Sequence, residues 1–159
     1  MWQFFSLLLC SVLSFSAYAA EGASDPIVGD WQTYDDKTGD KRAIVRVSYD
    51  KKNGSFYGRV IERNYISKAG MRTQETCYQC PKPFTDKKIK GMITLWGIKK
   101  TTTNKRYDYT GGNIIDPSRG KIYGLEMKLS RSGNLLKGRA FLLDMKRVGR
   151  QQTWVRVKK

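Results

Sequence analysis

The residues with the clearest chemical potential are Cys77 and Cys80, in the segment Cys77-Tyr78-Gln79-Cys80-Pro81. A C-x-x-C pair can form a disulfide, act as a thiol redox centre or supply half of a zinc site. The whole chain contains no histidine, so a zinc site would need a second chain or carboxylate ligands. Proline at position 81, where histidine would follow, argues against haem attachment. We therefore expect no metal and no cofactor.

A redox role and a structural disulfide remain as alternatives for this pair. Thiol oxidoreductases place C-x-x-C at a helix start, where the helix lowers the pKa of the attacking thiol. The flanking residues here favour loop and strand. We therefore favour a structural disulfide, which closes a short loop and stabilises the fold by roughly 2 kcal/mol in the loop-entropy model.

Catalysis by the common hydrolytic arrangements is hard to support. Without histidine, a Ser-His-Asp triad cannot form. Glu62 and Glu126 would pair as acid and base only if both faced a barrel interior, and we expect surface ion pairs instead. Gly111-Gly112 and residues 116–120 are expected to be turns, because no helix follows them to bind phosphate. We predict that the protein is not an enzyme.

The first residues predict export. Residues 1–19 carry no charged side chain, are mostly apolar and end in Ala17-Tyr18-Ala19, the layout of a cleavable signal peptide. An uncleaved anchor or a buried helix is the alternative. Leu9 precedes Cys10, where lipoprotein processing requires a small residue, so Cys10 is expected to leave with the signal. We predict a single domain over residues 20–159, periplasmic or secreted, with no transmembrane segment in the mature chain.

Alternating apolar and polar residues predict strands along nearly all of the mature chain. The alternation has a period of two at 43–49, 56–63, 91–98, 123–129 and 154–157. Turn-forming residues separate these runs, and their spacing predicts an antiparallel, up-and-down β-barrel of about eight strands. Residues 66–88 form one long irregular segment, which contains both cysteines. Such a loop in a tight barrel is expected to be functional or covalently held.

Gly29-Asp30-Trp31, at the expected first strand, resembles the opening motif of the lipocalins. The resemblance implies that Gly29 and Trp31 close one end of the barrel. It also implies that an arginine near the C-terminus, Arg150 or Arg156, covers the tryptophan ring by a cation–π contact.

Longer segments extend the resemblance over most of the mature chain. These are Val28–Trp31, Cys77–Cys80, Ile89–Gly97, Gly111–Pro117, Gly120–Tyr123 and Gly149–Val157. In this order they resemble the exported bacterial proteins of domain-of-unknown-function family 2147 (DUF2147). The resemblance implies a lipocalin-like barrel and a location in the cell envelope, but no reaction and no ligand.

Binding is the function class that remains. Residues that are candidates to line the barrel interior are Tyr57, Trp96, Tyr123, Met127 and Phe141, with Arg139 as an internal counter-charge; plain core packing is the alternative for each. The net charge of +16 favours an anionic partner. We predict a small apolar or amphipathic anionic ligand.

The alternative is an outer basic surface that binds envelope polyanions such as lipopolysaccharide, anionic lipid or glycan. Basic residues are spread along the whole chain without an RNA-binding motif. This distribution predicts no specific nucleic-acid partner.

Overall fold

The structure is a computed structural model that describes residues 24–64, 66–70, 72–103 and 106–158. The expected signal peptide, residues 1–19 with Cys10, lies outside the described residues.

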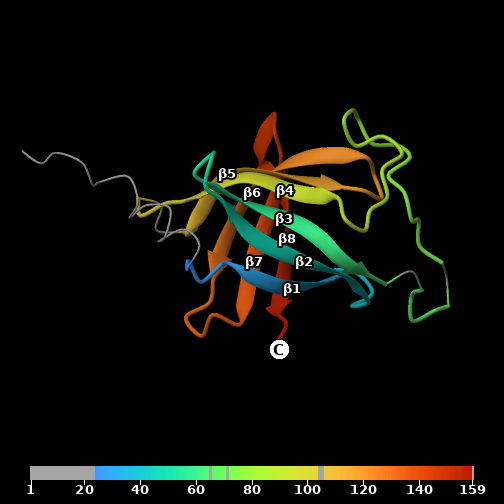
Figure 1. The fold of residues 1–159 in the computed structure, drawn as a ribbon, viewed down its shortest axis with the longest axis horizontal. Helices are drawn as coiled ribbons and strands as arrows, with labels where there is room; N and C mark the ends of the chain where they lie inside the picture. The colour runs from blue at the N-terminus through green and yellow to red at the C-terminus, as the bar shows by residue number, and fades with distance from the viewer. Residues whose placement is uncertain (1–23, 65, 71, 104–105, 159) are drawn as a thin grey trace, which may run out of the picture.

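Eight antiparallel strands follow one another in chain order around a closed barrel, with β8 returning to β1 (Figure 1). This confirms the predicted all-β, antiparallel, up-and-down barrel. The strands of the described chain are β1 (Gly29–Tyr34), β2 (Lys41–Asp50), β3 (Ser55–Arg63), β4 (Ile93–Lys100), β5 (Tyr109–Asp116), β6 (Lys121–Leu129), β7 (Leu135–Leu142) and β8 (Met145–Arg156).

The barrel has two different ends because the connections differ in length. At the open end, short turns join β1 to β2, β5 to β6 and β7 to β8, and the long connection 64–92 joins β3 to β4. The closed end holds the starts of β1, β3, β5 and β7 and is covered by the segment that precedes β1. In Figure 1 the long connection extends on the right of the view.

The period-two pattern sets which side chains face inward. Ala43, Val45 and Val47 of β2 are buried, and so are Phe56 and Val60 of β3. The predicted turn at Gly111-Gly112 is wrong. Both residues lie inside β5, where the register with β6 shifts between Tyr109 and Gly112. A β-bulge at this point needs an unusual backbone, and Gly111 supplies it with φ of 75°.

Arg156 and Trp31 meet at the closed end. Trp31 is fully buried and donates from its indole Nε1 to the Ile27 carbonyl at 2.9 Å. The Arg156 guanidinium lies 4.2 Å from the centre of the Trp31 ring. It also donates to the carbonyls of Gly133 at 2.7 Å and Val28 at 3.1 Å, and to the Pro26 carbonyl. One side chain therefore joins β8, the β6–β7 turn and the N-terminal segment.

Glycine at position 29 is required by this contact. Its φ is 140°, and a Cβ at this position would lie 2.6 Å from Arg156 Nη1. Any side chain would be strained and would displace the guanidinium. Arg150, the other arginine considered for covering Trp31, lies at the open end and pairs with Asp36.

A buried carboxylate fixes the N-terminal segment across the same end. Asp25 accepts hydrogen bonds from the Ile27 amide at 3.0 Å and the Tyr109 hydroxyl at 2.5 Å, and pairs with Lys100 at 2.8 Å. Burial, and to a lesser extent the hydrogen bond to Asp25, raises the pKa of Tyr109 well above its ordinary value. The phenol therefore stays protonated and keeps donating to Asp25.

No helix in the described chain combines the length and the apolar character that crossing a membrane requires.

Replacing Arg156 should destabilise the barrel far more than replacing an exposed arginine nearby. Arg156→Ala removes the cover of Trp31 and leaves the carbonyls of Gly133 and Val28, both partly buried, without their charged donor. We expect a loss of about 3 kcal/mol in the free energy of unfolding, measured by urea denaturation. The matched control is Arg46→Ala on β2, which loses a surface ion pair with Asp30 and should cost clearly less stability. Equal losses in the two variants would contradict the assigned role of Arg156.

Candidate functional site

The open half of the barrel contains a cavity of about 490 Å³. Its deeper walls are apolar and come from most of the strands. They include Ala43, Val45, Val60, Ile114, Ile115, Leu125, Ala140 and Trp154. The closed half is filled with fully buried side chains, among them Trp31, Val47, Ile98, Tyr109, Met127 and Leu136. The interior is therefore packed at one end and hollow at the other.

Charged side chains gather where this cavity meets the surface. The cations are Lys37, Arg42, Arg63, Arg119 and Arg150, and the carboxylates are Asp35, Asp36 and Asp116. Five cations against three carboxylates leave a net positive rim. A molecule with an apolar body and an anionic head would match both the walls and the rim.

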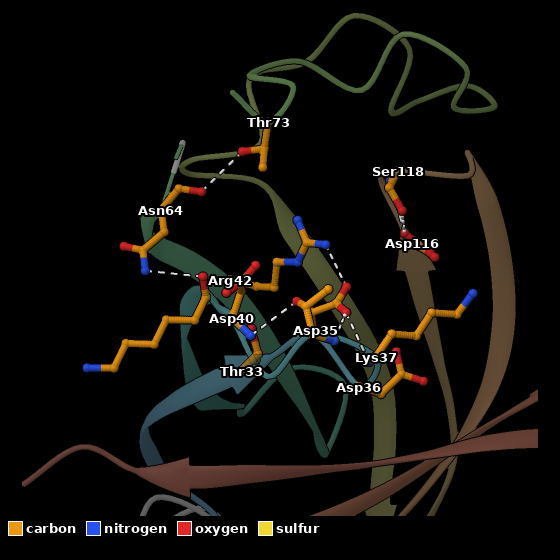
Figure 2. Close-up of polar contacts among 12 residues, drawn as sticks. Thr33, Asp35, Asp36, Lys37, Asp40, Arg42, Asn64, Thr73, Asp116 and Ser118 are labelled. Atoms are coloured by element: carbon orange, nitrogen blue, oxygen red, sulfur yellow. Dashed lines mark hydrogen bonds and ion pairs between the residues drawn. The ribbon is translucent and has the colours of Figure 1, made fainter. Parts of the chain in front are cut away.

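The first turn supplies a part of the rim that is held by several hydrogen bonds. Figure 2 shows Arg42 of β2 donating to Asp35, with Asp116 at the end of β5 and Ser118 in the β5–β6 turn nearby. Asp35 accepts from Arg42 Nη2 at 2.5 Å and from the amides of Lys37 at 3.0 Å and Thr38 at 2.9 Å. The bond from Arg42 and these amides hold the pKa of Asp35 well below its ordinary value. Asp35 is therefore an anion that positions Arg42 at the rim.

Cys77 and Cys80 form a disulfide in the long connection. Both residues are buried, Cys77 fully. The Cys77 amide donates to Lys87 O at 2.9 Å, and the Asp86 amide donates to Cys77 O at 3.1 Å. The pair thus closes a compact loop. Its flanking backbone is turn and bridge, which lacks the helix start that activates redox thiols.

The loop that the disulfide closes packs against the β5–β6 turn. Gly120 has φ of 63°, and a Cβ there would lie 1.9 Å from the Gln79 carbonyl oxygen. The Gln74 side chain also donates to the Pro117 carbonyl. Ile89, at the end of the same connection, is fully buried and lines the cavity. The long connection therefore supports one side of the cavity mouth.

The structure separates the predicted lining residues into three groups. Tyr123 lines the cavity. Met127 is fully buried in the filled half, and a Cβ on the cavity residue Gly138 would lie 3.5 Å from its Cε. The others point elsewhere. Tyr57 lies between the inward-facing Phe56 and Gly58 and is partly exposed on the outer wall.

Trp96, Arg139 and Phe141 also lie outside the cavity, so their prediction as lining residues is corrected. Trp96 packs against Phe84 of the long connection, with 5.3 Å between ring centres. Arg139 pairs across strands with Glu126, and Phe141 pairs with Gly124. The neighbouring residues of β6 and β7, Leu125 and Ala140, are the ones that line the cavity. Arg139 is therefore an outer-wall residue and no internal counter-charge.

A second hollow, of about 560 Å³, lies on this outer wall. It is lined by Arg106, Tyr107, Glu126, Arg139, Lys146 and Arg147. Glu126 is 7% exposed and pairs with Arg139 at 3.4 Å and Lys146 at 3.3 Å. Glu62 is exposed on β3, so these two glutamates form no acid–base pair across the interior.

The described residues contain no set of side chains that could hold a metal ion. No group of three or more cysteine, aspartate or glutamate side chains there lies close enough to hold an ion.

The comparison with family models decides the family. The model described as "Uncharacterized protein conserved in bacteria (DUF2147)" matches residues 29–156. The chain belongs to the DUF2147 family. The matched span begins at Gly29, which packs against Arg156, and ends at Arg156, so it contains all the strands of the barrel.

A solved structure shows the same fold. Protein HP1028 from Helicobacter pylori, described as a member of the lipocalin family, is similar with a TM-score of 0.64 and 22% sequence identity over 83% of each chain. No curated protein matches the sequence significantly. The likeness to HP1028 supports the lipocalin-like barrel of this DUF2147 protein.

The sequence reasoning missed the rim of the cavity. Asp35 and Asp36 follow β1 and Arg42 stands near the start of β2, so in the sequence they lie in or beside a segment of turn-forming residues. A signal was present, since acidic residues follow the end of β1 and basic residues stand at the start of β2. This charge pattern indicates a rim only once it is known which end of the barrel contains the cavity.

The rim carboxylate Asp35 should contribute stability that depends on pH. Its pKa is lowered in the folded protein, so its contribution is present above the ordinary pKa of about 3.9 and is lost as the pH falls below it. Asp35→Asn should therefore lower the free energy of unfolding at pH 7, and the difference from wild type should shrink in acid.

Urea denaturation across this pH range checks the result. Asp144→Asn, at an exposed position in the β7–β8 turn, is the matched control and should have little effect. A loss in Asp35→Asn that persists undiminished in acid would refute the ionic role.

Proposed function

We propose that the protein is a non-catalytic binder of one small amphipathic molecule with an anionic head, and that it works in the cell envelope. The cavity carries this proposal. Its volume of about 490 Å³ falls within the range of about 300–1,000 Å³ that is typical of small-molecule sites. Apolar walls would hold the body of the ligand, and the cationic rim would hold its head.

The position of the charges supports an amphipathic ligand over a wholly apolar one. Most of the cations that line the cavity belong to strand ends and turns of the open end, with Arg150 further along β8, whereas the deeper walls are mostly apolar. Charge at the mouth keeps its hydration, so it attracts an anionic head without the large cost of burying an unpaired ion. A head at the rim and a tail in the barrel satisfy both constraints.

Export is supported by two observations. Residues 1–19 have the signal-peptide pattern, and the Cys77–Cys80 disulfide is characteristic of oxidising compartments such as the periplasm. Because the disulfide is buried and lies in a turn, it supports a stapling role over the redox alternative.

Titration with a fluorescent long-chain fatty acid, cis-parinaric acid, and with the corresponding alcohol tests the ligand class. We expect the acid to bind at least about tenfold more tightly, because only its head carries charge for the rim. Ala140→Phe fills part of the cavity and should weaken both ligands by about tenfold or more. Thr153→Phe, on the exposed face of the neighbouring β8, is the control and should leave both affinities unchanged.

The outcomes separate the parts of the proposal. Equal affinity for acid and alcohol would overturn the anionic preference and leave cavity binding in place. Failure of both probes to bind, together with no co-purified molecule in native mass spectrometry of protein from its own envelope, would overturn the proposal.

The second candidate function is binding of envelope polyanions at the outer wall. The hollow with Arg106, Arg139, Lys146 and Arg147 favours it. Binding of this kind weakens steeply as salt is added, whereas an apolar tail in the barrel responds little to salt. Lipopolysaccharide binding measured at low and high ionic strength therefore distinguishes the two functions.

A further inference from the structure

The hairpin that joins β7 to β8 exposes several large apolar side chains. Leu143, Met145 and Val148 are 60%, 57% and 53% exposed. They lie close together in sequence, at the tip and base of one hairpin. The start of β8, which forms one arm of this hairpin, projects at the top of the view in Figure 1. Isolated exposed apolar residues are ordinary on a protein surface, but a cluster on a projecting element marks a contact site.

A bulge gives this hairpin its shape. Leu142 is opposite Met145, whereas the preceding residue Phe141 is opposite Gly149. Residues 146–148 are therefore extra on the β8 side, which bends the strand. The bend places Lys146 5.3 Å from the centre of the Phe141 ring on the outer wall, while Val148 lines the cavity.

Cations border the same apolar tip. Arg106, Arg139, Lys146 and Arg147 line the outer-wall hollow at the base of the hairpin. The carboxylates nearby are Glu126 in the hollow and Asp144 in the turn. Four cations against two carboxylates leave the region positive, in a chain of net charge +16. We call Leu143, Met145, Lys146, Arg147 and Val148 the hairpin patch.

We propose that the hairpin patch docks the protein on an anionic lipid bilayer. Leu143 and Met145 enter the headgroup region, and Lys146 and Arg147 contact the anionic headgroups. Apolar side chains flanked by cations have this interfacial preference because burial of apolar area and attraction to anionic lipid add together. A soluble polyanion would satisfy the cations but would leave the apolar tip in water.

The docked orientation brings the cavity mouth to the membrane. Leu142, Val148 and Arg150, at the base of the hairpin, line the cavity. An amphipathic molecule could therefore pass between bilayer and barrel beside the hairpin without its tail entering bulk water. This step rests on the proposed function, whereas docking itself does not.

Vesicle flotation with the purified protein, in the absence of added ligand, tests docking. One set of vesicles is pure phosphatidylcholine, and in the other about a third of the lipid is phosphatidylglycerol. We expect clear binding to the anionic vesicles, weaker binding to the neutral vesicles, and a decrease with salt. Arg147→Glu, at an exposed position, should lower partitioning onto anionic vesicles by about tenfold.

The apolar contribution is tested by Leu143→Ser combined with Met145→Ser, which should lower partitioning by about tenfold. The matched control is Leu135→Ser with Val155→Ser, a cross-strand pair at the closed end of the same two strands, each 37% exposed. Arg131→Glu, in the exposed β6–β7 turn, is the control for Arg147→Glu. Both controls should bind vesicles as wild type does.

The proposal would be overturned by no binding to anionic vesicles, by equal binding to neutral vesicles, or by equal losses in the controls. Loss with Arg147→Glu but none with Leu143→Ser and Met145→Ser would also overturn it, in favour of polyanion binding. The fatty-acid titration contains no vesicles, so failure of docking and failure of cavity binding are separate results.

Discussion

The contact between Arg156 and Trp31 is the constraint on which the closed barrel depends. β1 meets β8 through Trp31↔Arg156 and Gln32↔Val155, a shorter ladder than those of the other neighbouring strands described. Backbone pairing alone therefore contributes little at this seam. The guanidinium compensates by covering the indole and donating to three carbonyls in two separate segments, the N-terminal segment and the β6–β7 turn. Closure is thus a side-chain interaction as much as a sheet interaction.

Closing one end so firmly determines where a ligand can enter. An eight-stranded barrel has an interior that side chains can nearly fill. Here the large residues are concentrated at the closed end, with Trp31, Tyr109 and Met127 fully buried. Ala140 and Gly138 of β7 and Ala43 of β2 lie in the open half. The distribution of residue size along the strands, more than the fold itself, makes a cavity of about 490 Å³ at the end with the long connection.

The sequence predicted the barrel because period-two alternation depends only on local geometry. The same alternation places the apolar residues of β2 and β3 inward as expected. The alternation gave the wrong side where an outward-facing residue is buried by a group on the outer wall. Phe141 looks like a core residue because it is apolar and buried, but it packs over Gly124 on the outer wall. Trp96 is covered by Phe84 from the long connection. Neither covering group can be identified from the strand pattern alone.

The rim could not be predicted for a related reason. Its charges come from turns that are distant in sequence, and only closure at Arg156 brings them to one mouth. The disulfide then limits how that mouth is built, because Gln79 leaves no room for a side chain at Gly120 in the β5–β6 turn. One side of the mouth is thereby fixed by a covalently closed loop. The other side is the bulged β7–β8 hairpin, which lacks such a staple and exposes apolar side chains beyond the barrel wall. The two sides of the mouth therefore differ: the long connection holds one side in place, and the β7–β8 hairpin projects from the other. The hairpin is the side that would contact a surface first.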